Sequence, residues 1–142
     1  MDHFRVLIID DNAHVRRLVK EIVAQIPNTE SWECADGRAA IAVGQHWRAD
    51  IALVDYEMQP MNGVAFTEKV RAGETSLSTD MPIVMMTGHA DQAHVVRARK
   101  AGVNALLAKP LSVGAVVTTL QKMLHAQAQA ATSAGKQRGL AR

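Results

Sequence analysis

The sequence is poor in cysteine and in aromatic residues, and neither sign of charge dominates it. Cys34 is the single cysteine in 142 residues, which excludes an internal disulfide and favours a reducing, cytoplasmic location. No apolar run approaches the roughly 20 residues that a membrane-spanning helix needs, and the N-terminus lacks the pattern of a signal peptide. The net charge of +2 does not indicate DNA binding. We therefore expect no membrane association and no direct contact with DNA.

The composition is that of an ordinary globular protein, with 48% hydrophobic and 21% charged residues. Apolar strand patterns fall at residues 4–9, 51–54, 82–86 and 105–108, and a half-exposed edge strand is predicted around Trp32 and Cys34. Helical patterns alternate with them, at about residues 13–26, 37–47, 64–72, 91–101 and 112–125. Strands that alternate with helices in this way predict an α/β fold, with a parallel sheet covered by helices on both faces.

The domain is expected to occupy residues 1–126. Beyond about His125 the sequence AQAQAATSAGKQRGLAR contains hardly any large apolar residues. Such a segment cannot bury enough apolar surface to pack as a core helix. Residues 127–142 are therefore predicted to be a C-terminal tail, either a frayed helix or disordered.

Reactive side chains follow four of the predicted strands. Asp10 and Asp11 end the first strand, Asp55 the third, Thr87 the fourth and Lys109 the fifth. The carboxyl ends of parallel strands share one edge of a sheet, where ligands bind. Three close carboxylates repel one another, and Mg²⁺ is the cation that prefers such oxygen ligands. Aspartate is also a known covalent nucleophile that forms an aspartyl phosphate. If the strand order is 2-1-3-4-5, Asp55 is the best placed nucleophile.

The stretches LIIDDN, VDYEMQPMNG, MMTGHA and LLAKP resemble the signature stretches of bacterial response-regulator receiver domains, above all stand-alone chemotaxis receivers. The resemblance covers about Phe4 to Leu124. It implies a flavodoxin-like (βα)5 doubly wound sandwich with strand order 2-1-3-4-5. It also implies that Asp55 accepts a phosphoryl group from a phosphohistidine of a sensor histidine kinase or a histidine phosphotransfer protein. Such a domain catalyses at most its own phosphorylation and dephosphorylation.

The same resemblance implies a metal site. The carboxylates of Asp10, Asp11 and Asp55 and the backbone carbonyl of Glu57 would bind Mg²⁺, for which Mn²⁺ can substitute.

Thr87 and Lys109 have roles implied in the same way. Thr87 would close on the phosphoryl group, and Lys109 would pair with it. The bond between Lys109 and Pro110 is cis in such domains. The phosphorylated form would bind an unknown downstream protein through the face made by the fourth helix, the fifth strand and the fifth helix. Since no output domain is recognisable in this sequence, that output is expected to lie in another protein.

Two features depart from the family pattern, and a further pair of residues stands at positions that vary in function. Leu106 stands where receivers carry an aromatic switch residue, so the usual coupling of that ring to Thr87 cannot operate in its standard form. The loop proline is Pro60, one place later than usual. Glu57 and His89 follow Asp55 and Thr87 by two places, where receiver residues modulate the phosphoryl lifetime. The plainer alternative is that both are solvent-facing side chains.

Two other functions remain open at the level of sequence. A degenerate receiver would bind partners without phosphorylation, and Leu106 is compatible with that. A Mg²⁺-dependent phosphatase of the haloacid-dehalogenase type would also use an aspartate nucleophile. In that class, however, the nucleophile precedes the acid pair and is followed two places later by an acid. Here Asp10 and Asp11 come first, and the acid two after Asp55 is Glu57 and not an aspartate.

Overall fold

The structure is a computed structural model that describes the backbone of residues 3–140 and the side chains of residues 3–129. Its five strands are β1 (Phe4–Ile9), β2 (Thr29–Cys34), β3 (Ile51–Asp55), β4 (Ile83–Thr87) and β5 (Ala105–Ala108). They form one sheet in the order β2-β1-β3-β4-β5, with every neighbouring pair parallel. The predicted flavodoxin-like fold is confirmed. This order makes β3, which ends on Asp55, the central strand.

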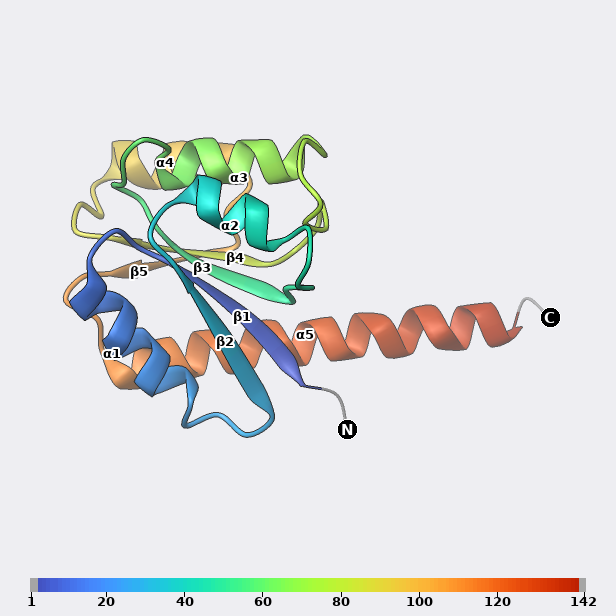
Figure 1. The fold of residues 1–142 in the computed structure, drawn as a ribbon. Helices are drawn as coiled ribbons and strands as arrows, with labels where there is room; N and C mark the ends of the chain where they lie inside the picture. The colour runs from blue at the N-terminus through green and yellow to red at the C-terminus, as the bar shows by residue number, and fades with distance from the viewer. Residues whose placement is uncertain (1–2, 141–142) are drawn as a thin grey trace.

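Five helices cover the two faces of the sheet: α1 (Ala13–Val23), α2 (Gly37–Val43), α3 (Gly63–Arg71), α4 (Gln92–Ala101) and α5 (Val113–Leu140). In Figure 1, α1 and α5 lie on one face, and α2, α3 and α4 lie on the other. Each face has its own apolar core. Leu53 of β3 packs with Ile22 and Leu120 on the first face, and Val54 packs with Phe66 on the second. The strand is apolar throughout because both of its faces are buried.

Polar caps start the helices directly after the loops at the strand ends. Asn12 accepts hydrogen bonds from the backbone N–H groups of His14 and Val15 at the start of α1. Asn62 does the same for Ala65 at the start of α3. Each cap satisfies N–H groups that have no partner within the helix. The caps therefore hold the helix starts close to the strand ends, where the reactive side chains stand.

Two helices end earlier than the sequence pattern predicts, and the prediction was wrong there. α1 ends at Val23 rather than 26, where the Thr29 hydroxyl donates to the carbonyls of Val23 and Ile26. α2 ends at Val43 rather than 47. The side chain of Trp47 instead packs on Trp32, with ring centroids 5.6 Å apart. In both cases a contact to β2 replaces continuation of the helix.

Helix α5 is longer than expected. It continues from Val113 to Leu140 and extends past the edge of the sheet in Figure 1. Val116 and Leu120 are fully buried and Leu124 is 6% exposed, so these residues anchor its first turns. The expected boundary at residue 126 falls inside this helix and stays a prediction, and residues 141–142 lie outside the described part. Within residues 3–140, no helix is both long and apolar enough to cross a membrane.

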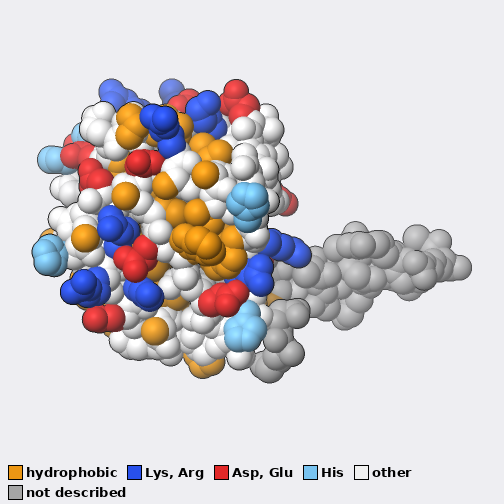
Figure 2. Space-filling model, viewed as in Figure 1, with side chains coloured by type: hydrophobic (Ala, Val, Ile, Leu, Met, Phe, Trp, Pro, Cys, Tyr) orange, Lys and Arg blue, Asp and Glu red, His pale blue; other side chains and the backbone are white. Residues whose placement is uncertain are grey.

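Charges of both signs are mixed over the surface. Figure 2 shows acidic and basic side chains interspersed on the face that it draws, among the residues described there. Opposite charges also pair directly within the described part of the chain, as Arg5 does with Glu30 at 2.7 Å. The expectation that charge does not favour DNA binding stays a prediction, and this mixed surface agrees with it.

Candidate functional site

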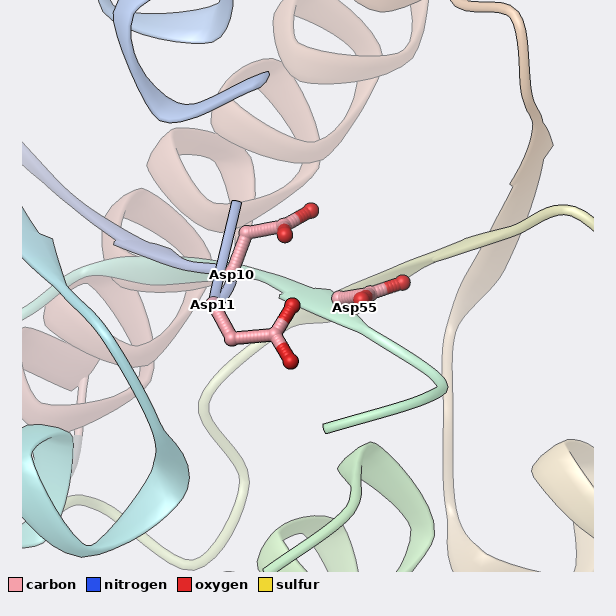
Figure 3. Close-up of side chains that lie close together, drawn as sticks. All are labelled: Asp10, Asp11 and Asp55. Atoms are coloured by element: carbon pink, nitrogen blue, oxygen red, sulfur yellow. The ribbon is translucent and has the colours of Figure 1, made fainter. Parts of the chain in front are cut away.

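Three carboxylates converge at the carboxyl edge of the sheet. Figure 3 shows Asp10 and Asp11 at the end of β1 with Asp55 at the end of β3. One oxygen from each lies within 4.8 Å of the others. Asp10 is fully buried, Asp55 is 5% exposed and Asp11 is exposed. The convergence follows from the topology, because β1 and β3 are neighbours in the sheet.

Lys109 neutralises the two buried acids. Its Nζ lies 3.0 Å from Oδ2 of Asp10 and 3.1 Å from Oδ1 of Asp55. Its backbone N–H donates to the Thr87 carbonyl at 2.8 Å, and the bond to Pro110 is cis. Burial alone lowers the pKa of Lys109, but the hydrogen bonds and charges of both aspartates outweigh burial and raise it. The ammonium therefore stays charged and crosses from β5 to the acids.

Asp55 is poised between opposing influences. Burial raises the pKa of its carboxyl, the neighbouring charge of Asp10 raises it further, and Lys109 opposes both. The net pKa lies above its ordinary value of 3.8. The protein alone therefore does not fully balance a negative charge on Asp55. An additional cation at this position would stabilise that charge.

The backbone near Asp10 is held by a residue that the sequence analysis missed. The Arg16 guanidinium donates to the Asp10 carbonyl at 2.6 Å. The backbone N–H of Asn12 donates to Oδ1 of Asp10 at 2.8 Å. Arg16 lies one turn beyond the Asn12 cap on α1, and this spacing was the available signal. Together these bonds fix one acid of the pair in place.

The hydroxyl of Thr87 is engaged within its own loop. It donates to the His89 carbonyl at 3.2 Å and accepts from the His89 N–H at 3.0 Å. Thr87 is 1% exposed. A Cβ added at the next residue, Gly88, would meet nothing within 4 Å, so the chain directly after Thr87 is not closely packed at that position. To donate to a group on Asp55, the hydroxyl would have to give up its bond to the His89 carbonyl.

The loop after Asp55 carries the late proline. The Tyr56 N–H donates to the Met86 carbonyl at 2.8 Å, and the Gly63 N–H donates to the Tyr56 carbonyl at 3.0 Å. These two bonds return the chain to α3 despite the shifted Pro60, whose bond to Gln59 is also cis. Beside it lies a pocket of about 310 Å³, lined by Asp11, Tyr56, Glu57, Met58, Gln59 and Asn62.

At Gly63 the packing leaves no room for a side chain. A Cβ there would lie 2.4 Å from the Asp55 carbonyl oxygen. We expect Gly63→Ala to lower the free energy of unfolding by about 1–3 kcal/mol, the usual cost of forcing extra atoms into a packed site. Chemical denaturation would measure it. Gly114→Ala is the control, since its Cβ would meet only Ser112 Oγ at 3.9 Å. Equal stability of the two variants would contradict the close approach.

Glu57 and His89 face each other across the two loops. Oε1 of Glu57 lies 3.2 Å from Nε2 of His89. The pair joins the β3–α3 loop to the β4–α4 loop just beyond Asp55 and Thr87. The sequence placed the two side chains at modulating positions but did not indicate that they meet.

Leu106 lies on β5 and is half-buried. Its side chain packs against the core under α2, α3 and α4. The switch position thus holds an aliphatic side chain that belongs to the core, in agreement with the departure seen in the sequence.

A scan against family models decides the assignment. Residues 6–121 match the model of the response regulator receiver domain. This chain belongs to that family. Receiver domains act as switches in two-component signalling and are not classical enzymes. The three-aspartate cluster described above stands at the acidic pocket where receivers bind Mg²⁺ and could hold a metal ion.

Relatives of this receiver include chemotaxis proteins. It is 27% identical over 123 residues to chemotaxis protein CheY-3 of Vibrio cholerae, covering 87% of this chain and 93% of the relative. It is 30% identical over 121 residues to a CheY homolog of Campylobacter jejuni, covering 84% and 92%. The solved structure of CheY4 from Vibrio cholerae superposes with a TM-score of 0.77 at 28% identity, covering 85% of this chain and 98% of that one.

Proposed function

We propose that this receiver is a phosphorylatable switch whose phosphoacceptor is Asp55. An oxygen of the carboxylate attacks the phosphorus of a phosphohistidine on a sensor histidine kinase or histidine phosphotransfer protein. The P–N bond breaks and the histidine leaves as imidazole. The observation that supports this most is the position of Asp55. It ends the central strand, nearly buried, and shares the Lys109 ammonium with Asp10.

A divalent cation fits the acids beside Asp55. We propose that Asp10, Asp11, Asp55 and the backbone carbonyl of Glu57 hold Mg²⁺, with Mn²⁺ as a substitute. The donor set consists of oxygen atoms, which both ions accept. The raised pKa of Asp55, due to burial and then to Asp10, supports a need for positive charge there. When bound, the ion would neutralise charge on the transferred phosphoryl group.

Lys109 and Thr87 would supply the remaining contacts to the phosphoryl group. The Lys109 ammonium already lies 3.1 Å from Asp55 and would pair with a phosphoryl oxygen. The Thr87 hydroxyl would exchange its donated bond to the His89 carbonyl for one to the phosphoryl group. Such a charge-assisted bond contributes roughly 1.5–3 kcal/mol. Moving a two-state equilibrium from 1:99 to 99:1 takes about 5.5 kcal/mol, so Thr87 would supply part of the shift.

The downstream partner would bind the face formed by α4, β5 and α5. Val96 on α4 is 42% exposed and Val113 on α5 is 46% exposed. Leu106 lies on β5 of the same face and is partly exposed. With Leu106 in place of a ring, we propose that this face changes by movement of the β4–α4 loop rather than by rotation of an aromatic side chain.

Phosphorylation of the wild type tests the proposal. We expect the protein to gain one phosphoryl group when incubated with Mg²⁺ and a small-molecule phosphodonor, as measured by intact mass. Omitting Mg²⁺ and adding a chelator should prevent the gain, because the three acids would then repel the donor. Titration of Mg²⁺ alone should be followed in parallel. A protein that binds Mg²⁺ and never gains the group would favour a degenerate receiver instead.

A further inference from the structure

Three rings form a column beside the candidate phosphoryl site. His94, on the first turn of α4, stacks on His89 with ring centroids 5.5 Å apart and an interplanar angle of 27°. The His94 ring also packs on Tyr56, with ring centroids 4.9 Å apart and an interplanar angle of 59°. Tyr56 follows Asp55 directly and is 6% exposed. We call these three residues the ring column, and His94 is its central member.

Asp91 fixes the orientation of His94. One oxygen, Oδ1, accepts from the His94 backbone N–H at 3.0 Å and caps α4. The other, Oδ2, lies 2.7 Å from Nδ1 of the His94 ring. A single carboxylate therefore starts the helix and orients the imidazole, which is only 28% exposed. The buried Tyr56 ring supports the imidazole in addition.

His89, on which His94 stacks, contacts two residues of the site. The His89 imidazole pairs with Glu57, and its backbone holds the Thr87 hydroxyl. The Glu57 and His89 side chains are 56% and 60% exposed. Ion pairs this exposed add little by themselves, because water competes for both partners. The stack on His94 gives the His89 ring a further contact besides this pair.

We propose that His94 is a positioning residue for the phosphoryl lifetime. By stacking on His89 it keeps the Glu57–His89 pair closed across the two loops beyond Asp55. Hydrolysis requires a water oxygen to attack phosphorus in line with the Asp55 oxygen, whose bond to phosphorus then breaks. Inorganic phosphate and the free carboxylate result, and the water proton leaves with the phosphate or the solvent. A closed pair at this place restricts that approach. The inference rests on the proposed function.

The lifetime is measured after removal of the phosphodonor, by following the loss of the phosphoryl group by intact mass. We expect His94→Ala to lose it about two- to tenfold faster, the range that loss of one aromatic contact allows. His94→Phe keeps a ring on His89 and should restore most of the lifetime. Asp91→Ser keeps a capping oxygen but loses the oxygen that orients the His94 ring. Its phosphoryl lifetime should lie between those of His94→Ala and His94→Phe. His46→Ala, at the end of the sheet remote from the site, is the matched control and should not change the rate.

A double-variant cycle separates positioning from a general loss of structure. If His94 acts through His89, His94→Ala should cause no further acceleration in a His89→Ala background. An additive effect, or an unchanged lifetime in His94→Ala, would overturn the inference.

A second measurement needs no phosphoryl group. The chain has one tyrosine, so 3-fluorotyrosine gives a single ¹⁹F signal from Tyr56. We expect His94→Ala to shift that signal, and an unchanged signal would overturn the ring column itself. A wild type that gains no phosphoryl group would refute the proposed function together with this inference. A wild type that gains it with the same lifetime as His94→Ala would refute this inference alone.

Discussion

Asp55→Asn is expected to abolish phosphorylation. The amide cannot act as the nucleophile, and neither remaining acid matches Asp55. Asp10 has no exposed surface on which to meet a donor, and Asp11 is exposed, away from the ion pairs of Lys109 with Asp10 and Asp55. Intact mass after incubation with Mg²⁺ and a small-molecule phosphodonor measures the loss, which should be essentially complete. Asp80→Asn is the matched control, an exposed aspartate just before β4, at the opposite end of the sheet. It should gain the phosphoryl group as the wild type does.

The stability of Asp55→Asn shows whether that loss comes from chemistry. Burial and the charge of Asp10 raise the pKa of Asp55 above 3.8. A folded-state pKa above the unfolded value means that the ionised group opposes folding once the pH exceeds 3.8. The neutral amide removes this cost, so the metal-free variant should melt no lower than the wild type at pH 7. A folded variant that is phosphorylated as well as the wild type would place the phosphoacceptor elsewhere.

Lys109→Met is expected to have the largest effect on stability. It leaves the fully buried Asp10 and the nearly buried Asp55 without their shared cation. Breaking a buried pair in this way costs about 3–5 kcal/mol, and we expect about 3 kcal/mol because Lys109 is 24% exposed. Phosphorylation should slow by about a hundredfold, since a charge that would face the transferred group is lost. Chemical denaturation and intact mass measure the two effects.

The pH dependence of Lys109→Met follows from Asp55. Lys109 opposes the upward shift of the Asp55 pKa, so its removal raises that pKa further. The cost of the ionised carboxylate is absent below 3.8 and grows as the pH rises through the folded-state pKa. The stability lost by the variant should therefore be smallest at acidic pH and largest at neutral pH, and added Mg²⁺ should recover part of it. Lys122→Met, on the exposed side of α5, should show neither effect.

Lys109→Met and Asp55→Asn also test the alternatives left open by the sequence. A degenerate receiver would lose stability in Lys109→Met without any phosphorylation to slow. A phosphatase of the haloacid-dehalogenase type would hydrolyse simple phosphate esters repeatedly. Family membership already assigns the chain to receivers, and a stable single phosphoryl group on Asp55 would complete that assignment.

The sequence alone predicted the α/β class and the residues at the ends of the strands. Strands that are buried on both faces have continuous apolar sequences. The polar residue at the end of each run is therefore easy to recognise. Asp10, Asp55, Thr87 and Lys109 were found in this way. Their meeting at one edge follows from parallel strands joined by helices. The strand order came from family resemblance, and the pairing of β1 with β3 confirms it.

The tertiary structure decided how side chains on different loops meet. Nothing in the sequence near Glu57 or His89 indicates that their side chains meet, because only the folded sheet brings the β3–α3 and β4–α4 loops together. His94 is close to His89 along the chain, but the stacking of the two rings depends on how the loop enters α4. The early end of α2 has the same cause, since Trp47 packs on Trp32 of the edge strand. Periodicity records which face of an element is buried and which residues cap it. It does not record which partner a half-exposed side chain contacts, as the Glu57–His89 pair in the loops after Asp55 and Thr87 shows.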